Sequence, residues 1–136
     1  MNIEITIPGK PMAKGRPRMT KYGHTYTPGK TIEYENFVRL VFMEKYKDYD
    51  PYDGKIKATI KAVFDIPKSY TKKKRTELLE SSNNYVSRPD CDNIAKIILD
   101  SLNGIAYKDD SQITILSVSK EYGSQSKVEV RLENID

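Results

Sequence analysis

Alternating apolar and polar residues predict four strands. Isoleucines occupy every second position of residues 2–7, and polar side chains stand between them, which is typical of a strand with one buried face. The same alternation runs through residues 55–66, and residues 112–121 and 127–133 also read as strands. A polar turn at residues 122–126 joins the last two strands.

Apolar residues three or four apart predict a helix at residues 31–47 and another at residues 90–103. In the first, Thr31 is suited to the N-cap, and Glu33 and Glu35 suit the positive end of the helix dipole. In the second, four residues form an apolar stripe for the core: Ile94, Ile97, Ile98 and Leu102.

A shorter helix is predicted at residues 70–82, capped by Ser69 or Thr71. Its first turn holds consecutive basic residues, Lys72 to Arg75, where the helix dipole disfavours cations by about 0.3–1 kcal/mol each. This placement favours a nearby anion such as a phosphate, although a solvated run of charge explains it equally well.

The order of these elements is roughly βα-βα-α-ββ, so we expect an α+β fold in which helices pack on a mixed β-sheet. With 136 residues, the chain predicts a single domain over residues 1–136. It shows no apolar run of about 18 residues and no signal-peptide pattern, and its one cysteine, Cys91, has no partner for a disulfide. We therefore expect a cytoplasmic protein with no membrane association.

The net charge of +4 and the isoelectric point near 9.0 permit nucleic-acid binding without establishing it. The loop at residues 8–29 is rich in proline and glycine, with a possible short hairpin around Tyr22-Gly23. Because prolines restrict the backbone around its cations, we favour phosphate contact over a solvated basic loop. The candidate DNA-binding residues of this loop and of the 70–82 helix are Lys10, Lys14, Arg16, Arg18, Lys72, Lys73, Lys74 and Arg75.

Acidic residues gather around the 90–103 helix of this otherwise basic chain. Asp90 and Asp92 stand at its start, and Asp109 and Asp110 follow its end. The simplest interpretation is structural: Asp90 caps the helix, Asp92 lies in its first turn, and Asp109 and Asp110 form a β-turn. If the turn returns to the helix start, carboxylates about 4 Å apart repel by roughly 4 kcal/mol at a dielectric constant of about 20, and a shared cation relieves this repulsion. With no histidine nearby, such oxygen ligands favour Mg²⁺, with Mn²⁺ as a substitute.

Lys96 lies one helical turn beyond Asp92. In that position it forms an ordinary salt bridge or, beside a metal-bound phosphate, stabilises the extra charge of a transition state.

Two motifs resemble those of a known family. The longer is Pro89-Asp90-x-Asp92-Asn93-x-x-Lys96-x-x-x-Asp100-x-Leu102-Asn103-Gly104, followed by Asp109-Asp110-x-Gln112. The other is Gly9-Lys10-Pro…Lys14-Gly-Arg16-Pro-Arg18, with Tyr26-Thr-Pro28 and a following Tyr34. Together they resemble the RusA family of Holliday-junction resolvases, and the resemblance runs across most of the chain.

The resemblance implies a RusA-like homodimer that resolves four-way (Holliday) DNA junctions in recombination and repair, with a divalent metal and no organic cofactor. It implies that Asp90, Asp92 and Asp110 are catalytic carboxylates that hold the metal, and that Lys96 is the catalytic lysine. The roles of Asp100 and Asp109 stay open.

One position departs from the family pattern. Some members have a basic residue directly before the first aspartate, whereas this chain has Pro89, and the nearest cation, Arg88, becomes a further candidate DNA contact. Two alternatives to a resolvase also stay open: a non-catalytic basic module that binds DNA or RNA, and a nuclease of broader branched-DNA specificity.

Overall fold

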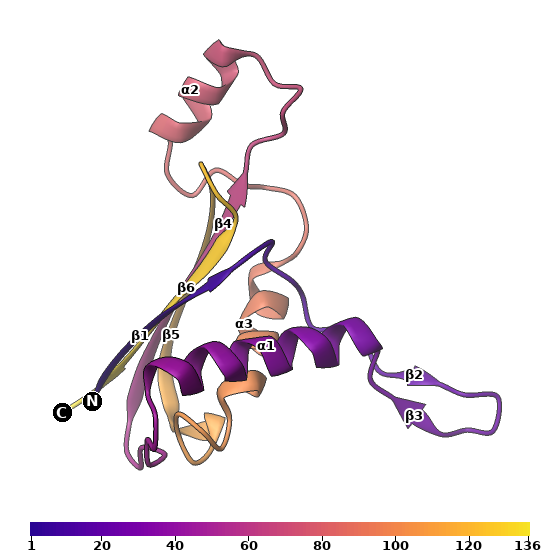
Figure 1. Ribbon diagram of the computed structural model, residues 1–136, viewed down its shortest axis with the longest axis vertical. Coiled ribbons are helices and arrows are strands. Elements are labelled where there is room, and N and C mark those ends of the chain that lie inside the picture. The colour runs from indigo at the N-terminus through magenta and orange to yellow at the C-terminus, as the bar shows by residue number, and fades with distance from the viewer.

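The four predicted strands form one mixed sheet in the order β1-β6-β4-β5, in a computed structural model that describes all of residues 1–136 (Figure 1). The strands are β1 (Asn2–Pro8), β4 (Ile56–Asp65), β5 (Ile113–Gly123) and β6 (Lys127–Asn134). β6 pairs antiparallel with β1 and β4, while β4 and β5 run parallel. The α+β class and the mixed sheet are therefore confirmed.

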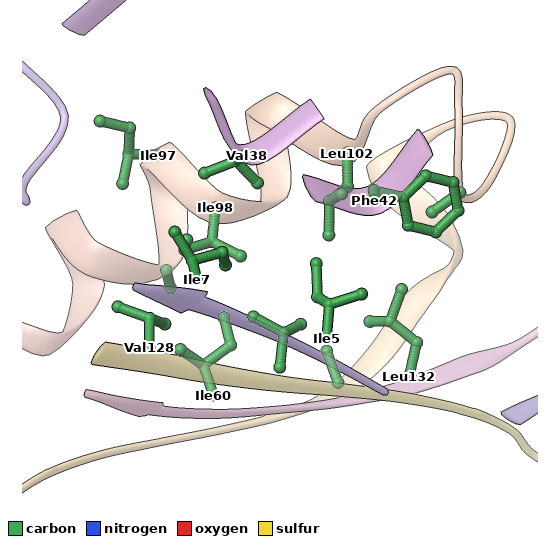
Figure 2. Close-up of a cluster of buried hydrophobic side chains, with 14 of the residues drawn as sticks. Ile5, Ile7, Val38, Phe42, Ile60, Ile97, Ile98, Leu102, Val128 and Leu132 are labelled. Atoms are coloured by element: carbon green, nitrogen blue, oxygen red, sulfur yellow. The ribbon is translucent and has the colours of Figure 1, made fainter. Parts of the chain in front are cut away.

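The core lies between one face of this sheet and two helices, α1 (Gly29–Lys45) and α3 (Cys91–Leu102). Figure 2 shows apolar side chains of both helices above those of the strands. The period-two isoleucines of β1 are at most 3% exposed, and the apolar stripe of α3 is fully buried. The apolar side chains of β1 and α3 therefore face the core, as predicted. The labelled residues of this layer are Ile5, Ile7, Val38, Phe42, Ile60, Ile97, Ile98, Leu102, Val128 and Leu132.

Parallel strands cannot be joined by a tight turn, and the connection from β4 to β5 contains α2 (Lys72–Glu80) and then α3. α2 has no buried residue and stands away from the sheet at the end of β4 (Figure 1). Its predicted cap at Thr71 is confirmed, because the Thr71 side chain accepts a hydrogen bond from the Lys74 backbone at 3.2 Å. No helix of the chain has the length and apolar character needed to span a membrane.

The start of α1 differs from the prediction. The helix begins at Gly29, with Pro28 at the N-cap, whereas Thr31 is buried within the first turn. The Thr31 hydroxyl instead accepts a hydrogen bond from the Gly15 backbone at 3.1 Å, so it fixes the preceding loop. Glu35 is also 7% exposed and does not face solvent at the helix end. The predicted N-cap role of Thr31 and the predicted dipole role of Glu35 were therefore wrong, because both side chains contact residues of the preceding loop instead.

The partner of Glu35 is Lys14. The Lys14 ammonium lies 2.8 Å from Glu35 of α1 and 3.2 Å from Asp100 of α3, and its backbone N–H donates to the Asn93 carbonyl at 3.2 Å. Burial lowers the pKa of Lys14, but hydrogen bonds and charges from both carboxylates outweigh this effect and raise it above 10.5. Lys14 therefore joins the N-terminal loop to both helices.

We expect Glu35→Gln to lower the free energy of unfolding by about 1–3 kcal/mol, because it weakens a mostly buried ion pair. Chemical denaturation measures this change. The matched control is Asp53→Asn, which breaks an ion pair whose side chains are 72% and 63% exposed, and should cost at most about 1 kcal/mol. Equal losses in the two variants would contradict a structural role for the buried pair.

Candidate active site along helix α3

The N-terminus of α3 presents two carboxylates with no structural partner. Asp90 is the N-cap residue, and its carbonyl accepts a hydrogen bond from the Ile94 backbone at 3.1 Å, but its carboxylate makes no capping hydrogen bond. Asp92 follows in the first turn, and both residues are exposed. Neither takes part in an ion pair of the chain. A side-chain cap therefore does not account for Asp90.

Lys120 of β5 fixes the residues that lead into α3. Its ammonium donates to the carbonyls of Ser87 and Pro89 at 2.8 and 2.9 Å. It also lies 5.6 Å from the centroid of the Tyr85 ring, which stacks on Phe64 with centroids 3.7 Å apart. Sequence reasoning missed Lys120, since nothing in the pattern of β5 distinguishes it from a solvated lysine.

Lys96 and Asp100 lie on the exposed side of α3 but differ in their contacts. Lys96 is exposed and makes no ion pair, whereas Asp100 holds Lys14. Asp100 therefore has a structural role, and Lys96 has a free charge one turn from Asp92.

Asp109 and Asp110 differ in the same way. Asp110 begins a 3-10 turn, η1 (Asp110–Gln112), and Asp109 is its N-cap residue, which forms a reciprocal capping box with Gln112. The Ser111 hydroxyl donates to the Asp109 carboxylate, and this hydrogen bond is the largest cause of the lowered pKa of Asp109. Gln112 in turn donates to the carbonyls of Tyr52 and Gly54. Asp110 is exposed and engaged in no ion pair, so of the two residues it is the free one.

Asp110 does not return to the start of α3 within one chain. The Tyr107 hydroxyl donates to the Leu99 carbonyl, so this connection is held at the C-terminal half of the helix. Burial raises the pKa of Tyr107, and the nearby charges of Asp110, Asp100 and Asp109 add to the rise.

Contacts along β5 also show that Asp110 is separated from the start of α3. The start of α3 lies beside Val118, where the Cys91 sulfur is 3.9 Å from the carbonyl oxygen. Asp110 precedes Ile113, at the other end of that stretch of strand, and five residues of strand span about 16 Å. No three histidine, cysteine or acidic side chains of the chain come together as metal ligands. The expectation that Asp90, Asp92 and Asp110 share one cation within a single chain is therefore not met.

The donor chemistry nevertheless suits a hard cation. Asp90 and Asp92 offer carboxylate oxygens with no competing hydrogen bond or ion pair. Mg²⁺ usually keeps several waters and takes only one or two carboxylates together with substrate phosphates. Asp90 and Asp92 are therefore donors of the kind that Mg²⁺ takes, with Asp110 outside this pair in a single chain.

The predicted DNA-binding residues differ in their contacts within the chain. Lys14 and Arg75 are engaged, since Lys14 forms the buried ion pairs and Arg75 donates to the Pro67 carbonyl at 3.0 Å. Lys74 is exposed but lies over the Tyr70 ring, 4.5 Å from its centroid. The others are exposed and form no ion pair: Lys10, Arg16, Arg18, Lys72, Lys73 and Arg88.

A short hairpin carries one of these exposed cations, Arg18. The strands β2 (Arg18–Met19) and β3 (Thr25–Tyr26) pair as the sequence suggested, and the hairpin projects from the body (Figure 1). Three of its side chains are large, apolar and exposed: Met19 at 69%, Tyr22 at 76% and Tyr26 at 49%. Sequence reasoning singled out only its cations, although aromatics interleaved with cations also favour nucleic acid.

Comparison with known proteins gave two matches. A family model described as endodeoxyribonuclease RusA matches residues 8–133. An uncharacterized protein, YqaN of Bacillus subtilis (strain 168), is 33% identical over 138 residues, which cover 98% of this chain and 96% of that protein.

We expect Asp109→Ala to lower the stability of the fold and Asp110→Ala to leave it unchanged, because only Asp109 caps the turn. Denaturation across a pH series measures both. The lowered pKa of Asp109 means that its carboxylate stabilises the fold above the unfolded value of about 3.9, and that this contribution is lost as pH falls through the folded value. The difference between wild type and Asp109→Ala should therefore shrink in acid, and equal effects of the two substitutions would contradict the assignment.

Proposed function

This chain belongs to the RusA endodeoxyribonuclease family, and on that premise we propose that it is a divalent-metal-dependent nuclease that cuts four-way DNA junctions. The observation that supports this best is the division of charges along α3. The side chains of Asp90, Asp92, Lys96 and Asp110 are exposed without an ion-pair partner, while the neighbouring Asp100 and Asp109 are engaged. These four charges add little to the stability of the fold, and they lie within the motif that resembles the family's, which together favour a role toward a ligand.

In this proposal Asp90 and Asp92 hold a Mg²⁺ ion, with Mn²⁺ as a substitute. When bound, the ion supplies Lewis-acid activation of water and neutralises charge on a scissile phosphate. Lys96 neutralises further negative charge on the phosphate as the bond breaks. Lys120 is a positioning residue, because it holds the carbonyl groups just before Asp90.

In this proposal the exposed cations contact the DNA. Lys72 and Lys73 stand on a helix that buries nothing, so their placement at its positive end is not required by packing. Arg16, Arg18 and the exposed rings of Tyr22 and Tyr26 give the loop and hairpin both charge and stacking surfaces. Because such contacts grip phosphates and exposed bases without reading base edges, they suit recognition of a branched shape. A four-way junction has near two-fold symmetry, so we also propose a homodimer that makes paired cuts.

Asp92→Asn should abolish junction cleavage in Mg²⁺, while junction binding persists or tightens because one negative charge is removed. Cleavage of a labelled synthetic junction and binding in EDTA measure the two effects. Asp50→Asn removes the same charge from an exposed position elsewhere and should cut like wild type. Wild-type rates in Asp92→Asn would remove Asp92 from the active site.

The double substitution Lys72→Ser with Lys73→Ser should weaken junction binding and reduce the slope of log affinity against log salt by roughly 2, as expected for two lost phosphate contacts. Titrations at several salt concentrations measure the slope. Lys47→Ser with Lys55→Ser removes equal charge from exposed positions outside α2 and should leave the slope nearly unchanged. Identical slopes for the two double variants would exclude α2 from the DNA contact.

Two alternatives predict different products from a panel of four-way, flapped and linear DNA. A non-catalytic binding module gives salt-dependent binding and no cleavage with Mg²⁺ or Mn²⁺. A nuclease of broader specificity cuts flaps as readily as junctions.

A further inference from the structure

The turn of the β2–β3 hairpin is fixed by one threonine. The Thr20 hydroxyl accepts hydrogen bonds from the backbone N–H groups of Tyr22 and His24, at 3.3 and 3.2 Å. The Thr20 backbone closes the same turn, because its N–H donates to the His24 carbonyl at 2.7 Å and its carbonyl accepts from the Gly23 N–H at 3.0 Å. Gly23 has a φ of 82°, which glycine adopts without strain. The tip of the hairpin is therefore a defined turn.

This turn holds an aromatic ring and a cation at one point. Tyr22 is 76% exposed, and the Lys21 ammonium lies 5.2 Å from the centroid of its ring. The neighbouring Met19 and Tyr26 are also large and exposed. An aromatic ring stacks on any base, because every base has a π-face, and a cation beside the ring neutralises phosphate charge. A fixed, exposed ring next to a cation is thus suited to a base that its neighbours do not cover.

The charge around the hairpin favours nucleic acid as the partner. Residues 5–32 contain six basic residues and no acidic residue. The exposed apolar side chains of α1, such as Leu40 and Met43, have different surroundings, because Glu33 and Glu44 are exposed on the same helix. The hairpin therefore combines exposed rings with positive charge alone, which is the combination that single-stranded or unpaired nucleic acid requires.

The base of the hairpin is anchored on α3 and α1. The Lys14 backbone N–H donates to the carbonyl of Asn93, in the first turn of α3, and the Lys14 ammonium pairs with Asp100 of the same helix. The Gly15 N–H donates to the Thr31 hydroxyl of α1 at 3.1 Å. A Cβ at Gly15 would lie 2.5 Å from that oxygen, so the close approach requires glycine. These contacts tie the hairpin to the helix that carries the candidate metal ligands.

We propose that Tyr22 stacks on a base uncovered at the branch point of the junction, and that this contact sets which phosphate reaches Asp90 and Asp92. The inference rests on the proposed function for its catalytic meaning. In a linear duplex both faces of a base pair are covered, so a base must first be unstacked at a cost, whereas stacking is interrupted where strands exchange. Tyr22 therefore distinguishes branched from linear DNA, and the anchored hairpin holds the branch at a fixed distance from the start of α3.

Paired binding titrations in EDTA test the selectivity. Tyr22→Ala should weaken binding to a four-way junction by roughly 5- to 150-fold, as expected for one lost base–aromatic stack, and binding to a linear duplex of the same sequence by less than about twofold. Tyr22→Phe keeps the ring and should bind both DNAs like wild type. The control, Leu40→Ala, removes an exposed apolar side chain of α1 and should also bind like wild type. An equal loss on both DNAs, or no loss on the junction, would overturn the proposal.

Photocross-linking tests the contact without cleavage. A junction that carries iododeoxyuridine either next to the branch point or deep in one arm is irradiated with the wild-type protein in EDTA. A cross-link to Tyr22, identified by mass spectrometry, is expected only from the branch-point position. A cross-link to Tyr22 from both positions, or from neither, would contradict the proposal. If the wild type cuts no DNA in Mg²⁺ yet the branch-point cross-link forms, the proposed function fails and the contact stands.

The positions of the cuts test the second part of the proposal. With protein well above its Kd for the junction, the wild type and Leu40→Ala should cut the same narrow set of phosphates near the branch point. Tyr22→Ala keeps the metal ligands but loses the contact that fixes the branch, so its cuts should spread over more positions. End-labelled junction strands resolved on a sequencing gel measure the distribution. A wild-type distribution in Tyr22→Ala would show that Tyr22 does not set the cut position.

Discussion

The parallel pairing of β4 with β5 is the constraint on which the site depends. Parallel strands need a long crossover, and here that crossover contains α2 and α3. α3 packs on the sheet and ends near Tyr107, and the chain then enters β5 from the end where Ile56 pairs with Ile113. The start of α3 and the start of β5 are consequently at opposite ends of the same layer. The acids of one continuous motif therefore lie in two places: Asp90 and Asp92 at the start of α3, and Asp110 before the start of β5.

Some charged residues of the motif form contacts within the chain and others do not. This difference separates structural residues from candidate site residues better than their positions in the sequence do. Asp100 and Asp109 stabilise the fold, one through Lys14 and the other through the capping box. Asp90, Asp92 and Lys96 form no such contact although suitable partners are close in sequence. Exposed acids without an ion pair are common in this chain, so it is the position of Asp90 and Asp92 together at the start of α3, one turn from the free charge of Lys96, that supports a ligand as their partner.

Local periodicity was enough to predict the sheet and α3, because burial of one face imposes a period of two or 3.6 on the sequence. The isoleucines of β1 and the stripe of α3 are examples. Periodicity could not predict that Glu35 would be buried against Lys14, or that Thr31 would bind the Gly15 backbone, since these contacts join segments with no common period. It also could not predict the separation of Asp110 from Asp90, which follows from the direction in which β5 pairs. The motif identified which residues matter, and only the fold shows which of them a single chain can bring together.

Separating the acids within one chain has an energetic consequence for the site. Two carboxylates about 4 Å apart repel by roughly 4 kcal/mol at a dielectric constant of about 20, and a folded chain with Asp110 distant from Asp90 avoids this cost. Asp90 and Asp92 stay together at the start of α3, where a bound divalent cation would offset the mutual repulsion of their carboxylates. Under the proposed function, the ion binds at a helix start that the contacts of Lys120 with the Ser87 and Pro89 carbonyls already hold in place.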